Sequence, residues 1–68
     1  MDSTDVRIDV EYIDKLLFSL LGSYELVDKW WKGPNKAFNM KTPVELWMEG
    51  GESREKVKIY VESFAFGP

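Results

Sequence analysis

The stretch that decides the fold runs from Trp30 to Leu46 and reads WWKGPNKAFNMKTPVEL. Its second half carries a strong helix start, with Thr42 as the N-cap, Pro43 as the first helical residue and Glu45 as the return arm of a capping box. Its first half ends the preceding helix at Gly33-Pro34, because proline cannot continue a helix and restricts the residue before it. The stretch therefore predicts the corner of a small helical domain.

Two helices are predicted on the N-terminal side of this corner. Apolar residues recur at helical spacing from about Val10 to Leu21, and Gly22 ends that helix as a left-handed residue. Ser23 then caps the helix that reaches Gly33. Residues 6–9 alternate between apolar and polar, which leaves two alternatives open: a helix that begins near residue 9, or an extended lead-in.

One more helix is predicted after the helix that starts in this corner. The corner helix starts at Thr42, is short and ends at Gly50-Gly51. Ser53 is expected to cap the last helix. Apolar residues recur in that helix at i, i+3, i+4 and i+7, from Val57 to Phe64. The sequence thus predicts an all-α fold, a small single-domain bundle of about four short helices. Residues 1–9 are expected to form a loose lead-in, and residues 10–68 the helical domain.

Composition excludes several classes of function. The 68 residues contain neither cysteine nor histidine and have a formal net charge of -3. The commonest metal ligands and the commonest general base are therefore missing, and the hydroxyls of Ser23, Thr42 and Ser53 are better explained as helix caps. We expect no catalysis, no metal and no cofactor. An acidic start and a longest apolar run of only residues 16–21 predict a cytoplasmic protein without a membrane segment.

Several large side chains divide between core and surface in the expected bundle. Trp30 is expected in the core, whereas for Trp31 core and partner surface are about equally favoured. Val44, Trp47 and Met48 share one helical face and are expected to be mostly core. Leu46 is expected at an interface and Phe64 in the core. Phe66 is expected to be exposed near the chain end, and Phe18 lies off the main apolar stripe of its helix. An apolar residue such as Phe18 suggests a second buried surface, against a twin copy or a partner.

The order of these motifs resembles the toxin-binding domain of Xre/MbcA/ParS-type antitoxins of bacteria. The resemblance covers about residues 16–66. It rests on the following residues in order: Gly22-Ser23, Glu25, Trp30-Trp31, Pro34-Asn35, Ala37-Phe38, Thr42-Pro43, Glu45-Leu46 and the helix with Val57, Tyr60 and Val61. One departure is Met40, which stands where the family usually has glycine, and Asn39 could take up a left-handed turn in its place.

A second departure from that family concerns DNA binding. Family members usually carry an N-terminal helix-turn-helix region, for which these 68 residues leave no room. A stand-alone variant, a truncated chain and a domain used for another purpose remain as alternatives.

The resemblance implies a protein that neutralises a toxin with a RES domain, an enzyme that consumes NAD, by covering its active site. No NAD or other cofactor would bind to the antitoxin itself. The residues expected to contact the partner are Trp31, Asn35, Phe38, Met40, Phe64, Phe66 and Gly67. Two other hypotheses compete. One is a self-associating helical module, for example a homodimer, and the other is a nucleic-acid-binding domain that uses lysines around the Pro-Asn loop, which the net acidity disfavours.

Overall fold

The computed structural model describes residues 3–67 of the chain, with side chains from Asp9 onward. Within this range the protein is all-α, as predicted. Its elements in chain order are α1 (Ser3–Leu21), α2 (Tyr24–Lys32), the single-turn 3-10 helix η1 (Lys36–Phe38), α3 (Pro43–Glu49) and α4 (Gly51–Phe66). The expected lead-in at residues 1–9 falls partly outside the described residues, at positions 1 and 2. From residue 3 onward it is helical rather than extended.

The early start of α1 has a simple physical reason. A short extended segment without a neighbouring strand leaves its backbone N–H and C=O groups without partners, whereas a helix pairs them locally. The alternating pattern of residues 6–9 therefore yields to continuation of the helix. Helix α1 therefore begins at Ser3 and not at about Val10, where the sequence predicted its start.

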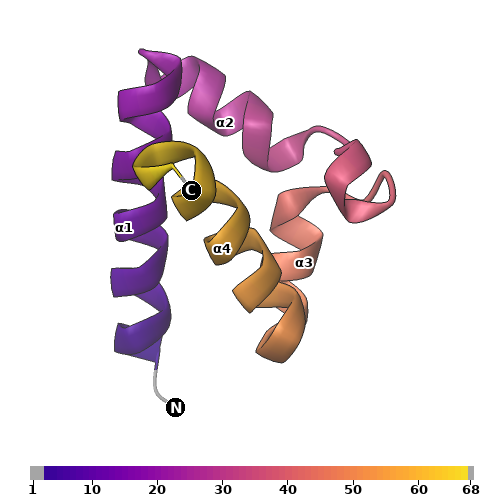
Figure 1. Cartoon of the computed structure of the whole chain (residues 1–68). Helices are drawn as coiled ribbons and strands as arrows, with labels where there is room; N and C mark the ends of the chain where they lie inside the picture. The colour runs from indigo at the N-terminus through magenta and orange to yellow at the C-terminus, as the bar shows by residue number, and fades with distance from the viewer. Residues whose placement is uncertain (1–2, 68) are drawn as a thin grey trace.

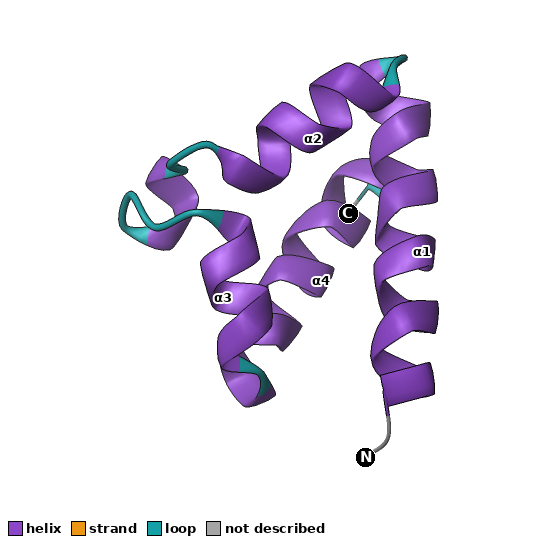
Figure 2. Ribbon diagram, turned by 180° about the vertical axis from the view of Figure 1, so that it is seen from behind, coloured by secondary structure: helices purple, strands orange, loops and turns teal. Residues whose placement is uncertain are grey.

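Helix α1 forms one side of the molecule, and α4 lies beside its C-terminal half (Figure 1). Helix α2 leads from the end of α1 across to the far side, where η1 turns the chain back into α3 (Figures 1 and 2). Helices α3 and α4 are joined at Gly50 and pack against each other. A long-range hydrogen bond ties the two longest helices together, from the Tyr12 hydroxyl to Glu62 Oε2 at 2.6 Å.

The predicted helix caps at Ser23 and Thr42 are confirmed. The Ser23 hydroxyl accepts from the N–H of Leu26, and the Thr42 hydroxyl accepts from the N–H of Glu45, both at 3.2 Å. Each bond satisfies one of the free N–H groups at a helix N-terminus. The cap expected at Ser53 is wrong, because α4 begins at Gly51. The Ser53 hydroxyl instead donates to Glu49 Oε1 at 2.8 Å and links the end of α3 to the first turn of α4.

The loop between α2 and α3 is closed by its own backbone. Asn35 pairs with Lys41 in an isolated bridge, and its side-chain oxygen accepts from the N–H of Ala37 at 2.9 Å. The chain reverses through two left-handed residues, Asn39 with φ of 56° and Met40 with φ of 67°. The expectation that Asn39 takes up a left-handed turn is therefore confirmed, and Met40 shares the turn.

The core lies where all four α-helices and η1 meet. Its buried apolar residues are Ile13, Leu17, Val27, Phe38, Leu46, Trp47, Val57 and Val61. Arg54 links α4 to α3 beside this core. Its Nε and Nη2 atoms donate to the Trp47 carbonyl at 3.1 and 3.0 Å. The same guanidinium lies 5.2 Å from the centre of the Trp47 ring, a cation–π distance.

Four side chains of α3 and α4 lie elsewhere than predicted. Leu46 is buried rather than at an interface, whereas Val44 and Met48 are exposed rather than in the core. Helix α3 has only two turns, so it presents one narrow side to the core, and that side is formed by Leu46, Trp47 and Pro43. Phe64 is also exposed, because it lies beyond Val61 at the rim of the bundle.

Candidate partner-binding surface

The two adjacent tryptophans line two different grooves. The apolar groove has a volume of about 330 Å³ and is lined by Leu17, Leu20, Leu21, Trp30, Tyr60, Val61 and Phe64. The acidic groove has a volume of about 310 Å³ and is lined by Val10, Asp14, Asp28, Trp31, Lys32, Val44, Trp47 and Met48. Consecutive helical residues point about 100° apart, so Trp30 and Trp31 diverge from α2. Both rings are partly buried and pack against the core.

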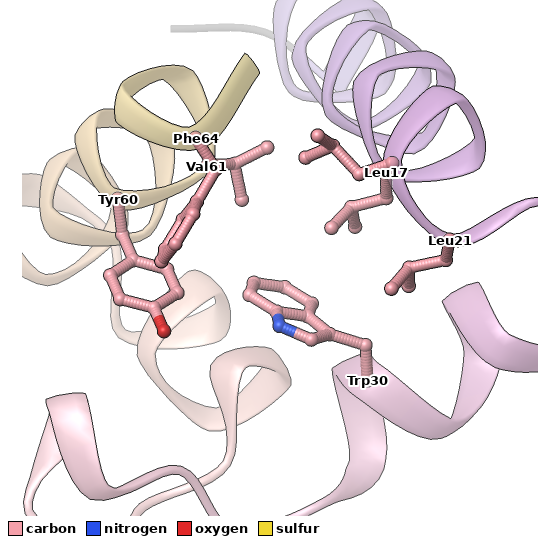
Figure 3. Close-up of a pocket in the computed structure, with 7 residues that line it drawn as sticks. Leu17, Leu21, Trp30, Tyr60, Val61 and Phe64 are labelled. Carbon is pink, nitrogen blue, oxygen red and sulfur yellow. The ribbon is translucent and has the colours of Figure 1, made fainter. Parts of the chain in front are cut away.

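The apolar groove lies between α1, α2 and α4. In Figure 3 the Trp30 ring extends into the space between Leu17 and Leu21 of α1 and the side chains of α4. Trp30 stacks on Tyr60 with 6.3 Å between ring centres, and Phe64 meets Tyr60 edge-on at 4.9 Å. The aromatic contacts hold the floor of this groove in one shape, and leave Leu20 and Phe64 exposed at its rim.

The acidic groove lies between α1, α2 and α3. Trp31 Nε1 donates to Asp14 Oδ1 at 2.7 Å, which positions the ring against α1. Trp31 also meets the buried Trp47 ring edge-on, with 5.6 Å between ring centres. Trp47 Nε1 is a buried side-chain donor without a hydrogen-bond partner in the described part of the chain. Trp31, for which core and surface were equally favoured, is thus half core and half groove wall.

A continuous row of aromatic rings joins the two grooves. It runs from Trp47 through Trp31, Trp30 and Tyr60 to Phe64, with each ring centre 4.9 to 6.3 Å from the next. Pairs at these separations add to the stability that area burial supplies. The row makes the walls of both grooves parts of one packed unit.

The seven residues expected to contact a partner do not form one site. Trp31 lines the acidic groove and Phe64 the apolar groove, while Phe66 and Gly67 border a shallow hollow beside Ile59 and Ser63. Asn35 and Met40 lie in the loop around η1, where Met40 is exposed.

Phe38 is the expected contact residue that the structure places elsewhere. Its ring is 7% exposed and packs edge-on against Tyr60, with 5.0 Å between ring centres. Phe38 therefore belongs to the core, because η1 folds back over the bundle and turns this ring inward.

Sequence reasoning missed Leu20, Tyr24, Val44 and Met48 as surface residues. Met48 is the most exposed of the large apolar side chains, at 77%. Its exposure follows from the shortness of α3, which the glycines at positions 50 and 51 already indicated. Tyr24 is exposed at the start of α2, where its ring lies 4.5 Å from that of Phe18.

The lysines proposed for nucleic-acid binding are mostly engaged with carboxylates. Lys29 lies 3.7 Å from Glu25, and Lys32 lies 3.1 Å from Asp28. Lys41 lies 3.4 Å from Glu49. Such exposed pairs contribute little stability, but they offset the positive charge that a phosphate backbone would need.

Two titratable groups are shifted by their hydrogen bonds. The Ser53 hydroxyl, with Lys41 nearby, holds the pKa of Glu49 below its usual value. The hydrogen bond to Glu62 raises the pKa of Tyr12 above its usual value, because ionisation would lose that bond. Each of these bonds connects two neighbouring elements, α3 with α4 for Glu49 and α1 with α4 for Tyr12.

Among the described residues, no group of three or more acidic side chains is arranged to hold a metal ion. None of the helices in the same range combines the length and the apolar character needed to cross a membrane. Comparisons with protein-family models, with curated proteins and with solved structures find no significant match for this chain.

Proposed function

We propose that this chain is a protein-binding module, and that it acts as the toxin-binding part of an antitoxin. The observation that carries the first part is the apolar groove, whose lining consists of aliphatic and aromatic side chains. Exposed apolar surface around a preformed groove favours docking of another protein, and aromatic anchors dominate the energy of such interfaces. A catalytic role has no comparable support, since the side chains that line the apolar groove include no carboxylate, amine or thiol.

The second part of the proposal rests on the resemblance to Xre/MbcA/ParS-type antitoxins. On this proposal the partner is a RES-domain toxin that consumes NAD, and the chain blocks it by steric cover. On this proposal the exposed residues Phe64, Phe66 and Gly67 at the C-terminal end of α4 would contact the partner. Met40 and Asn35 would contribute contacts from the loop around η1.

The test is co-expression with the product of the neighbouring gene, with growth and co-purification as readouts. Leu20→Ser at the rim of the apolar groove is compared with Leu26→Ser on α2, because these leucines are 44% and 45% exposed and Leu20 lines the apolar groove whereas Leu26 does not. Formation of a complex that restores growth, weakened by Leu20→Ser alone, supports the proposal. A toxic neighbour that forms no complex with this chain refutes the antitoxin role.

Self-association is the second candidate, favoured by the exposed rings of Phe18 and Tyr24, which lie against each other where α1 is followed by α2. A twin copy could cover these side chains at the end of α1. A light-scattering mass of two chains, reduced to one chain by Phe18→Ser, would support this alternative over the antitoxin role.

A further inference from the structure

We propose that the acidic groove binds a peptide segment of the partner protein that carries an apolar side chain flanked by arginine or lysine. This inference rests on the proposed protein-binding function and names the chemistry of the partner at a second surface. It concerns the groove beside Trp31, and not the apolar groove beside Trp30.

The floor of the acidic groove is apolar and open to a ligand. Trp31, Trp47 and Val44 supply aromatic and aliphatic walls, and Met48 stands exposed at the edge. Methionine adapts its shape to different partners, and it is common at surfaces that bind peptides. A bound apolar side chain would cover Met48 and Val44 and remove them from water.

The rim of the groove is negatively charged. Asp14 and Asp28 line it, and Glu45 and Glu49 border the shallow extension formed by Val44 and Met48. Lys32 pairs with Asp28, and Lys41 pairs with Glu49. Four carboxylates against two ammonium groups leave this surface with a formal charge of -2.

This charge selects the occupant. An acidic segment would be repelled, and a second copy of this chain, with a net charge of -3, would bring more negative charge to the surface. A basic segment would instead be attracted to the groove. Arginine pairs with carboxylates, and it also stacks on aromatic faces such as that of Trp31. Asp14 already accepts from Trp31 Nε1 through Oδ1, so the carboxylate is held in place before a ligand arrives.

The experiment selects ligands for the 68-residue chain from a phage-displayed library of random short peptides. Enriched peptides are synthesised with a fluorescent label, and their affinities are measured by anisotropy at low and high salt. The expected ligands carry arginine or lysine beside an apolar residue, and salt weakens their binding.

Three variants locate the binding. Met48→Lys is expected to weaken binding about tenfold or more, since it removes the apolar contact and adds a repelling charge. Ile59→Lys adds the same charge on α4, outside the acidic groove, and is expected to change binding less than about twofold. Asp14→Asn keeps an oxygen that can accept from Trp31 but removes the charge, and is expected to weaken binding about two- to fivefold.

Three outcomes would refute the inference. The library could enrich acidic or uncharged peptides, or it could enrich no peptide at all. The third is an equal loss of peptide affinity in Met48→Lys and Ile59→Lys. Circular dichroism of each variant separates lost binding from lost folding, and Asp14→Asn, the mildest change, keeps the test decisive if Met48→Lys unfolds. A co-expressed complex that depends on Leu20 while the peptide test fails would leave the proposed function standing and remove this inference alone.

Discussion

Met40 offers the sharpest test of the loop that turns the chain between α2 and α3. Its backbone is left-handed, with φ of 67°, while its side chain is 58% exposed. Left-handed backbone costs an L-residue about 1–2 kcal/mol, whereas glycine enters it freely but loses about 0.5–1 kcal/mol more conformational entropy on folding. Met40→Gly should therefore be more stable than Met40→Ala by about 0.5–1 kcal/mol.

The matched control is Glu55, an exposed residue in the second turn of α4. Right-handed helical backbone favours alanine over glycine by about 1 kcal/mol. The order of the two substitutions should thus be reversed, with Glu55→Ala more stable than Glu55→Gly. Opposite signs at two exposed positions cannot arise from lost side-chain contacts, because each pair compares the same two small residues.

The assay is urea unfolding of the four variants, followed by the fluorescence of the three tryptophans. A difference of about 0.5–1 kcal/mol moves the melting temperature of a domain this small by about 2–8 °C, so a thermal scan provides a second reading. If alanine were as favourable as glycine at position 40, the left-handed turn and the loop geometry built on it would be wrong.

Three further predictions address the core, the groove wall and the surface charges. Phe38→Ala should destabilise the domain by about 3–5 kcal/mol, as expected for an aromatic ring removed from a core. The control Phe66→Ala should cost less than about 0.5 kcal/mol. Equal costs in urea unfolding would contradict the placement of Phe38 in the core. Trp31→Phe removes the hydrogen bond to Asp14 and should cost about 1–2 kcal/mol; a double-mutant cycle with Asp14→Ala should give a coupling above about 0.5 kcal/mol, and an additive result would argue against the bond. The lowered pKa of Glu49 means that its contribution to stability is present above the usual glutamate range and is lost as the pH falls through the lowered value. Glu49→Gln should therefore flatten the acid side of the stability–pH profile, and an unchanged profile would show that this carboxylate is not linked to folding.

Local sequence signals predicted the helices and most of their ends. The hydroxyls of Ser23 and Thr42 cap helices as expected, since a cap depends only on residues within one turn. The cap predicted at Ser53 was wrong because α4 already begins at Gly51, so Ser53 lies within its first turn and its hydroxyl donates to Glu49. The alternating start of α1 failed as a strand signal, because a strand needs a neighbouring strand and residues 3–67 form none beside it.

The candidate binding surface was only partly predictable. Trp31 and Phe64 were named from sequence and both line grooves, but Phe38 proved to be core and Met48 proved to be surface. Helical periodicity identifies residues that share a face, yet it does not state which face meets the bundle. In α3 the burial of Trp47 was predicted correctly, whereas Val44, Met48 and Leu46 were assigned to the wrong side, because the helix is too short for its pattern to decide.

The sequence by itself determined the all-α class, the helix stops at glycine and proline, and the absence of histidine and cysteine chemistry, because each depends on residue type and near neighbours. Only the tertiary structure decided that Trp30 and Trp31 serve separate grooves, and that Asp14, seventeen residues from Trp31, holds the wall of one of them. Packing between helices distant in sequence sets which side of each helix is buried. That choice depends on how the whole chain minimises its exposed apolar surface, and no single segment encodes it.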